Sequence, residues 1–240
     1  MWAPDDGVRT VLVVAAHPDD IDFGAAGSVA ALTASGCAVT YCIVTDGQAG
    51  GFDRSQSRLA VGARRRKEQS AAAAEVGVQQ VVFLGYPDGA LTPSLELRRD
   101  LTRVIRQVRP QRVIAPSPER DWSRIFASHP DHLATGEAVI CAVYPDSRNP
   151  FAHPELLDTE GLEPHTVEQL WLMASSRLDL VVDITSTFDR KIAALSCHES
   201  QLPNGKPPVE RLYEWAAGTA RMAGLPEGSL AEGFQTVRTA

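Results

Sequence analysis

The sequence contains no apolar run of about eighteen residues or more, the length that a membrane-spanning helix requires. Its acidic start, residues 1–6, lacks the basic and apolar stretches of a secretory leader, so we expect no signal peptide. The net charge is −7, and the densest basic run, residues 64–67, fits a solvated helix face better than a phosphate-binding patch. This charge argues against nucleic acid or an anionic membrane as a partner. We therefore predict a cytoplasmic protein, and we leave the oligomeric state open, including a homo-oligomer.

Cysteine is also scarce, and the four cysteines form no CxxC pair. A zinc site built from thiolates is therefore not indicated, and buried, reduced thiols are expected instead. The chain has no internal repeat and no low-complexity segment. A length of 240 residues is enough for one large hydrophobic core. We predict a single domain over residues 1–240, with a helical segment from about residue 187 to 240 packed on it.

Strand and helix patterns alternate along the chain. The predicted strands cover residues 8–15, 38–45, 80–84, 112–115, 169–174 and 180–184. The predicted helices cover residues 27–35, 58–76, 95–108, 130–144, 187–198 and 209–222. Most of these strands are continuous apolar runs, which is typical of a parallel sheet covered on both sides. The pattern predicts a Rossmann-like α/β fold: a mostly parallel sheet with helices on both faces.

Two short polar motifs follow predicted strands, and both carry metal-binding residue types. The first, Ala-His-Pro-Asp-Asp at residues 16–20, comes directly after the apolar run at residues 11–15. The second, His-Pro-Asp-His at residues 129–132, opens a predicted helix more than a hundred residues later. Ligands of such sheets bind outside the carboxyl ends of the strands, so we expect the two motifs to meet there. Each motif alone could instead be a turn in which aspartate caps a helix. Together they favour one metal site.

The spacing suggests how a metal would be held. His17 and Asp20 lie three residues apart around a tight turn and can face one ion, and His132 would be the third ligand. Two histidines and one carboxylate leave a position for water, which is typical of a catalytic site. A bound divalent metal lowers the pKa of that water. Zn²⁺ is the expected ion, and these ligands also suit Fe²⁺.

The remaining polar residues of the motifs suggest proton-transfer roles. Asp19 is the natural general base, because it adjoins a ligand but projects differently. His129, one helical turn before His132, could carry a proton and face the developing oxyanion. Asp131 could accept a hydrogen bond from an imidazole and so fix its tautomer.

These and further motifs resemble the LmbE-like, PIG-L-type zinc deacetylases, which remove acetyl groups from N-acetylglucosamine-type substrates. Besides the two metal motifs, the matching segments are residues 23–27, 45–50, 65–68, 84–89, 182–185, Lys191 and 198–201. The resemblance implies zinc binding by His17, Asp20 and His132, with Asp19 as general base and His129 stabilising the oxyanion. It also implies that Arg65 and Asp88 contact sugar hydroxyls. An ion pair within a helix is the alternative for Arg65, and a turn is the alternative for Asp88.

The leading hypothesis is hydrolysis of an N-acetyl amino sugar or glycoside by a zinc-bound water. One alternative is an amidase of a larger conjugate that uses the same metal chemistry. Another is a metal-holding or sugar-binding protein without turnover, against which the intact ligands and base argue. A nucleotide-binding role is disfavoured because residues 24–27, Gly-Ala-Ala-Gly, do not form a G-x-G-x-x-G fingerprint.

Overall fold

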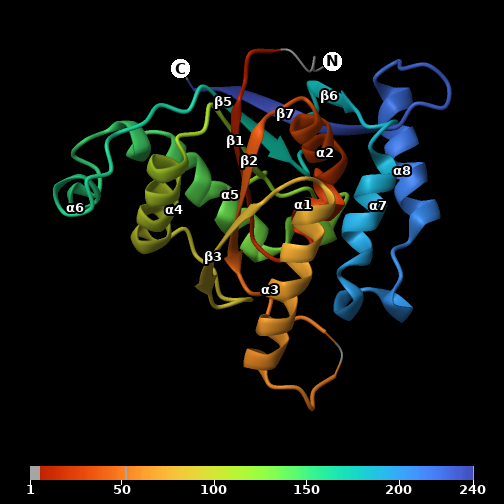
Figure 1. Cartoon of the computed structure of the whole chain (residues 1–240), viewed down its shortest axis with the longest axis horizontal. Helices are drawn as coiled ribbons and strands as arrows, with labels where there is room; N and C mark the ends of the chain where they lie inside the picture. The colour runs from red at the N-terminus through yellow and green to blue at the C-terminus, as the bar shows by residue number, and fades with distance from the viewer. Residues whose placement is uncertain (1–5, 52, 240) are drawn as a thin grey trace.

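A seven-stranded sheet forms the centre of the computed structural model, which describes residues 6–51 and 53–239 (Figure 1). Residues 1–5, part of the segment on which we base the expected lack of a leader, lie outside the described residues. The strand order is β3-β2-β1-β4-β5-β7-β6. The first five strands in this order are parallel, whereas β7 runs antiparallel to both β5 and β6. The strands are β1 (Thr10–Ala15), β2 (Ala38–Thr45), β3 (Gln80–Tyr86), β4 (Arg112–Pro116), β5 (Gln169–Met173), β6 (Leu180–Asp183) and β7 (Ala231–Arg238).

Helices cover both faces of this sheet, which confirms the predicted α/β architecture. Helices α4 and α5 lie on one face, and α1, α2, α3, α7 and α8 lie on the other (Figure 1). The helices are α1 (Asp20–Gly24), α2 (Ala26–Ala34), α3 (Arg58–Glu75), α4 (Leu95–Val108), α5 (Pro130–Val143), α6 (Pro154–Asp158), α7 (Phe188–Ser196) and α8 (Val209–Met222). Within the described residues, none of these helices combines the length and hydrophobicity needed to cross a membrane.

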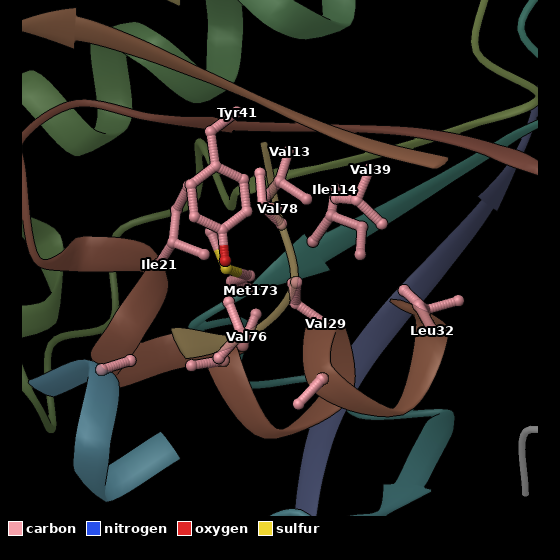
Figure 2. Close-up of a cluster of buried hydrophobic side chains, with 14 of the residues drawn as sticks. Val13, Ile21, Val29, Leu32, Val39, Tyr41, Val76, Val78, Ile114 and Met173 are labelled. Carbon is pink, nitrogen blue, oxygen red and sulfur yellow. The ribbon is translucent and has the colours of Figure 1, made fainter. Parts of the chain in front are cut away.

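The continuous apolar strands supply two cores at once, because successive side chains point to opposite faces of the sheet. Val13 of β1 packs in the core beneath α2, together with Val29 and Leu32 of that helix (Figure 2). Its neighbours Leu12 and Val14 point the other way, into the core beneath α4 and α5. A strand buried on both faces therefore shows no alternation of polar and apolar residues, which explains the continuous apolar runs in the sequence.

Helix α5 approaches the sheet through Gly136. A Cβ atom at this position would lie 2.5 Å from the carbonyl oxygen of Pro116 and 2.8 Å from the backbone nitrogen of Pro118. Backbone atoms cannot rotate away, so Gly136→Ala should lower the free energy of unfolding by about 1–3 kcal/mol. Urea denaturation measures this change. Gly218→Ala in α8 is the matched control, because its nearest neighbour is 3.8 Å away, and an equal loss there would contradict the argument.

The structure differs from the sequence prediction in at least three segments, one of which is the additional short helix α6. The region predicted as one helix, residues 27–35, is preceded by a separate short helix, α1. The helical conformation is interrupted at Ala25, between α1 and α2. The segment expected to be helical from about residue 187 to 240 also contains strand β7, which lies between β5 and β6. This strand adds an antiparallel element to the sheet.

Candidate metal centre

The loop after β1 carries the first motif, and strand β2 holds it in place. The backbone N–H and the hydroxyl of Thr45 both donate to the carbonyl oxygen of Ala16, at 2.8 and 2.9 Å. Within the loop, Asp20 Oδ2 accepts the backbone N–H of His17 at 2.8 Å. Helix α1 starts at Asp20, so the loop is fixed at both ends. His17 and Asp20 are thereby directed toward the same point at the carboxyl edge of the sheet.

The second motif forms the start of helix α5 and reaches the same point. Pro130 occupies the first helical position, as predicted, and His132 lies in the first turn. His132 Nε2 is 3.2 Å from His17 Nδ1 and 3.0 Å from Asp20 Oδ1. His17 Nδ1 is also 3.4 Å from Asp20 Oδ2. Ligand atoms that share one zinc ion at about 2.0–2.2 Å lie roughly 3–3.5 Å apart, so these donors fit such an ion.

The other ring nitrogen of His17 contacts two carboxylates. Its Nε2 lies 3.1 Å from Asp88 Oδ1 and 3.3 Å from Asp131 Oδ2. Asp131 is itself fixed, because it accepts the backbone N–H groups of Gly89 and Leu91 at 2.7 and 3.2 Å. Carboxylates in this position keep the proton on Nε2, which leaves Nδ1 free to bind a metal. The sequence predicts that an imidazole donates a hydrogen bond to Asp131, and in the structure this imidazole is that of His17.

The electrostatics of the site favour a positive charge at its centre. Burial lowers the pKa of His17, but the carboxylates of Asp20, Asp131 and Asp88 outweigh burial and raise it to about 12. Burial raises the pKa of Asp20, but His132 and His17 outweigh it and hold that pKa well below its usual range. Histidine nitrogens and carboxylate oxygens together are typical zinc ligands, so the same groups would stabilise a divalent cation at this point.

A third imidazole, that of His129, faces the same cluster. One of its ring nitrogens lies within 4.8 Å of the donor atoms of His17 and His132. Its Nδ1 accepts the backbone N–H of Asp131 at 3.2 Å, which places the proton of the neutral ring on Nε2. Burial, and then the positive charges on His17 and His132, lower the pKa of His129. His129 is therefore a neutral hydrogen-bond donor at neutral pH.

Asp19 lies beside the three donor residues in a strained backbone conformation. Its φ of 93° is in the left-handed region, which costs a non-glycine residue about 1–3 kcal/mol. Two contacts hold it there: its N–H donates to Gln69 Oε1 at 2.9 Å, and its Oδ2 accepts from Arg65 at 3.2 Å. Burial raises the pKa of Asp19 to about 6, even though Arg65 lowers it. A carboxylate with this pKa suits a general base near neutral pH.

Arg65 and Asp88 are buried side chains that contact residues of the first motif, Asp19 and His17 respectively. Arg65 is 4 % exposed and also donates to the carbonyl oxygens of Pro18 and Gly47, at 2.5 and 2.9 Å. These contacts give Arg65 a structural task, which is to position Asp19. Asp88 is likewise buried, with its carboxylate against His17. The sugar contacts that the resemblance implies for both residues stay predictions.

A pocket of about 810 Å³ opens beside the three donor residues. Asp20 and His132 line it, and helix α8 contributes Arg211, Leu212 and Trp215 to the lining. Its volume is in the range of pockets that hold drug-sized ligands. The site therefore has room for much more than an acetyl group.

Comparison with known proteins identifies the family. Residues 12–143, which contain both motifs, match the family of GlcNAc-PI de-N-acetylases, PIG-L. This chain belongs to the PIG-L family. Diacetylchitobiose deacetylase from Thermococcus kodakarensis is 33% identical to it over 204 residues, which cover 83% of this chain and 73% of the relative.

Two further similarities support this membership in the PIG-L family. A Bacillus cereus protein named "Probable N-acetyl-alpha-D-glucosaminyl L-malate deacetylase 2" is 34% identical over 200 residues, covering 80% of this chain and 84% of the relative. The structure of N,N'-diacetylchitobiose deacetylase from Pyrococcus horikoshii superposes with a TM-score of 0.89 at 32% identity. It covers 98% of this chain and 86% of that one.

Sequence reasoning did not assign a role to a buried polar network behind Asp19 in this PIG-L family member. Gln69, which holds the Asp19 N–H, donates to Asp22 Oδ2 at 2.9 Å. His198 Nε2 lies 2.8 Å from the same oxygen and is fully buried. The sequence does contain an indication of this network. Arg65 and Gln69 stand four residues apart on the inward face of α3, where apolar residues are expected.

Proposed function

We propose that this PIG-L family member hydrolyses the N-acetyl amide of an N-acetylglucosamine-type sugar, using Zn²⁺ held by His17, Asp20 and His132. One observation carries the proposal. Donor atoms from two motifs, 115 residues apart at His17 and His132, lie 3.0–3.4 Å from one another. A half-buried carboxylate, Asp19, and a neutral imidazole, His129, stand beside them.

Asp19 carries both proton transfers, and His129 contributes a hydrogen bond. A zinc ion held by His17, Asp20 and His132 would supply Lewis-acid chemistry, polarising a carbonyl and lowering the pKa of water. Asp19 takes the proton from the attacking water on its carboxylate, while Arg65 keeps that carboxylate oriented. His129 donates its Nε2–H to the oxygen on which negative charge develops. The proton collected by Asp19 then passes to the leaving nitrogen, which departs as the amine.

Metal removal tests the proposal directly. Chelator-treated protein should release no acetate from N-acetylglucosamine or diacetylchitobiose, and one equivalent of Zn²⁺ per chain should restore release. His132→Ala should bind less zinc and stay inactive after reloading, because it removes one of three ligands. His153→Ala is the matched control, since that imidazole contacts Asp146 at 3.4 Å, outside the cluster. Acetate release by the zinc-free protein, or stoichiometric zinc in active His132→Ala, would refute the proposed metal centre.

A further inference from the structure

Two side chains of α3 hold the peptide between Pro18 and Asp19 at both of its ends. Arg65 donates to its carbonyl oxygen at 2.5 Å, and Gln69 Oε1 accepts its N–H at 2.9 Å. Arg65 and Gln69 are both buried and lie one turn apart on the same face of the helix. Because a peptide is planar, these two contacts fix the orientation of the whole unit.

The left-handed backbone of Asp19 needs this restraint. On the other side of the residue, the carbonyl oxygen of Asp19 accepts the N–H of Phe23 at 3.0 Å, in the first turn of α1. With the peptides on both sides fixed, φ is held at 93°. A strained φ persists only where the surrounding contacts determine it. Loss of one contact would let this φ relax and would change the direction of the Asp19 carboxylate.

The side-chain amide of Gln69 can hold the peptide in only one of its two orientations. Its oxygen must face the N–H of Asp19, because its NH₂ group would place donor against donor there. Asp22 selects this orientation, since its Oδ2 accepts Gln69 Nε2 at 2.9 Å. In the reversed orientation, two acceptor oxygens would face each other. Gln69 and Asp22 are both fully buried, so water could not compensate for that mismatch.

His198 holds Asp22 from a distant part of the chain. Its Nε2 lies 2.8 Å from Asp22 Oδ2, although the two residues are 176 positions apart in the sequence. A carboxylate oxygen only accepts, so the imidazole donates. His198, Asp22, Gln69 and the backbone of Asp19 therefore form one chain of hydrogen bonds with fixed donors and acceptors. His198 and Gln69 are both fully buried, so neither can contact a substrate.

We infer that Gln69 and His198 are positioning residues: joined by Asp22, they fix the peptide before Asp19 and so direct the carboxylate of the proposed base. The inference rests on the proposed deacetylation and extends it to residues outside the pocket. Neither residue belongs to the proposed metal centre. Their loss should therefore lower kcat while KM and zinc content stay unchanged.

Kinetics of zinc-loaded variants test the inference. Methionine keeps the length of the glutamine side chain but cannot accept the backbone N–H. Gln69→Met should therefore lower kcat by about 10²-fold, the cost of misplacing a reacting group by about 1 Å. In the Asp19→Asn background the same substitution should lower kcat no further, because no base is left to direct. His198→Leu should also lower kcat, and His198→Gln, whose amide can donate to Asp22, should keep most of the wild-type value.

The matched control is Thr33→Val, which removes a hydrogen bond of 2.6 Å to the carbonyl oxygen of Val76 at the other end of α3. It should keep the wild-type kcat. Wild-type kcat in Gln69→Met, or equal losses from that substitution in the wild-type and Asp19→Asn backgrounds, would overturn the inference and leave the deacetylation intact.

Hydrogen exchange of the Asp19 amide, followed by NMR, reports the same chain of hydrogen bonds without turnover. Exchange should be slow in the wild-type protein and in His198→Gln, and faster in His198→Leu and Gln69→Met. Equal exchange in all four proteins would overturn the inference. This exchange pattern in a wild-type protein that releases no acetate would refute the proposed deacetylation and leave the fixed orientation of Asp19 standing.

Discussion

Asp19→Asn should lower kcat by about 10²–10⁴-fold, the usual contribution of a general base, while zinc stays bound. The asparagine amide cannot accept the proton from water, so the attack loses its base. The three proposed ligands are untouched, because Asp19 contacts Arg65 and Gln69 and not the donor atoms of His17 or His132. Steady-state acetate release and zinc content per chain, measured on the same preparation, check both parts.

The strained backbone at Asp19 provides a second measurement on the same position. Asparagine tolerates the left-handed region, so Asp19→Asn should fold normally. Glycine relieves the strain at φ 93°, so Asp19→Gly should be more stable than Asp19→Ala by about 1 kcal/mol. Asp158→Asn on α6 is the matched control, because it removes an exposed aspartate far from the motifs in sequence. Near wild-type turnover in Asp19→Asn, or loss of its zinc, would refute the assignment of the base.

Much of the fold could be predicted from the sequence because local signals mark its elements. Helix α4 was predicted to the residue, since Ser94 caps its start and Pro110 follows its end. The meeting of the two motifs also followed from fold class alone, because parallel strands bring their carboxyl ends to one edge of the sheet. The structure places His17 and His132 there, 3.2 Å apart between ring nitrogens.

The features that the sequence analysis does not predict depend on tertiary contacts, which no local sequence pattern encodes. Strand β7 contains Glu232 and Gly233, residues that strands disfavour, and its place is set by pairing with β5 and β6. The network of Gln69, Asp22 and His198 joins three helical regions, and no spacing rule connects them. The direction of Arg65, inward to Asp19, is likewise decided by the backbone carbonyls that surround it.

A buried ion pair that involves β7 contacts the helices next to the candidate metal-site loop, residues 16–20. Its loss should have the largest effect on stability. Lys191 and Glu232 are 3% and 6% exposed, and their charged atoms lie 2.5 Å apart. Lys191 also donates to the carbonyl oxygen of Phe23 in α1 at 2.7 Å. Glu232 accepts the N–H groups of Gly27 and Ser28 at the start of α2, at 3.1 and 2.7 Å. The pair therefore ties α7 and β7 to the two helices that follow the first metal motif.

Lys191→Met should lower the free energy of unfolding by about 3–5 kcal/mol, because it leaves the Glu232 carboxylate buried without its counter-charge. Urea denaturation of the zinc-free protein measures this loss without a contribution from metal binding. The double variant Lys191→Met/Glu232→Gln should recover part of it, since no net charge then remains buried. Glu160→Gln, which breaks an exposed pair with Arg103, should shift the denaturation midpoint far less. If Lys191→Met and Glu160→Gln shifted the midpoint equally, the pair could not be what fixes α1, and the placement of Asp20 at the start of that helix would have to come from the β1 loop alone.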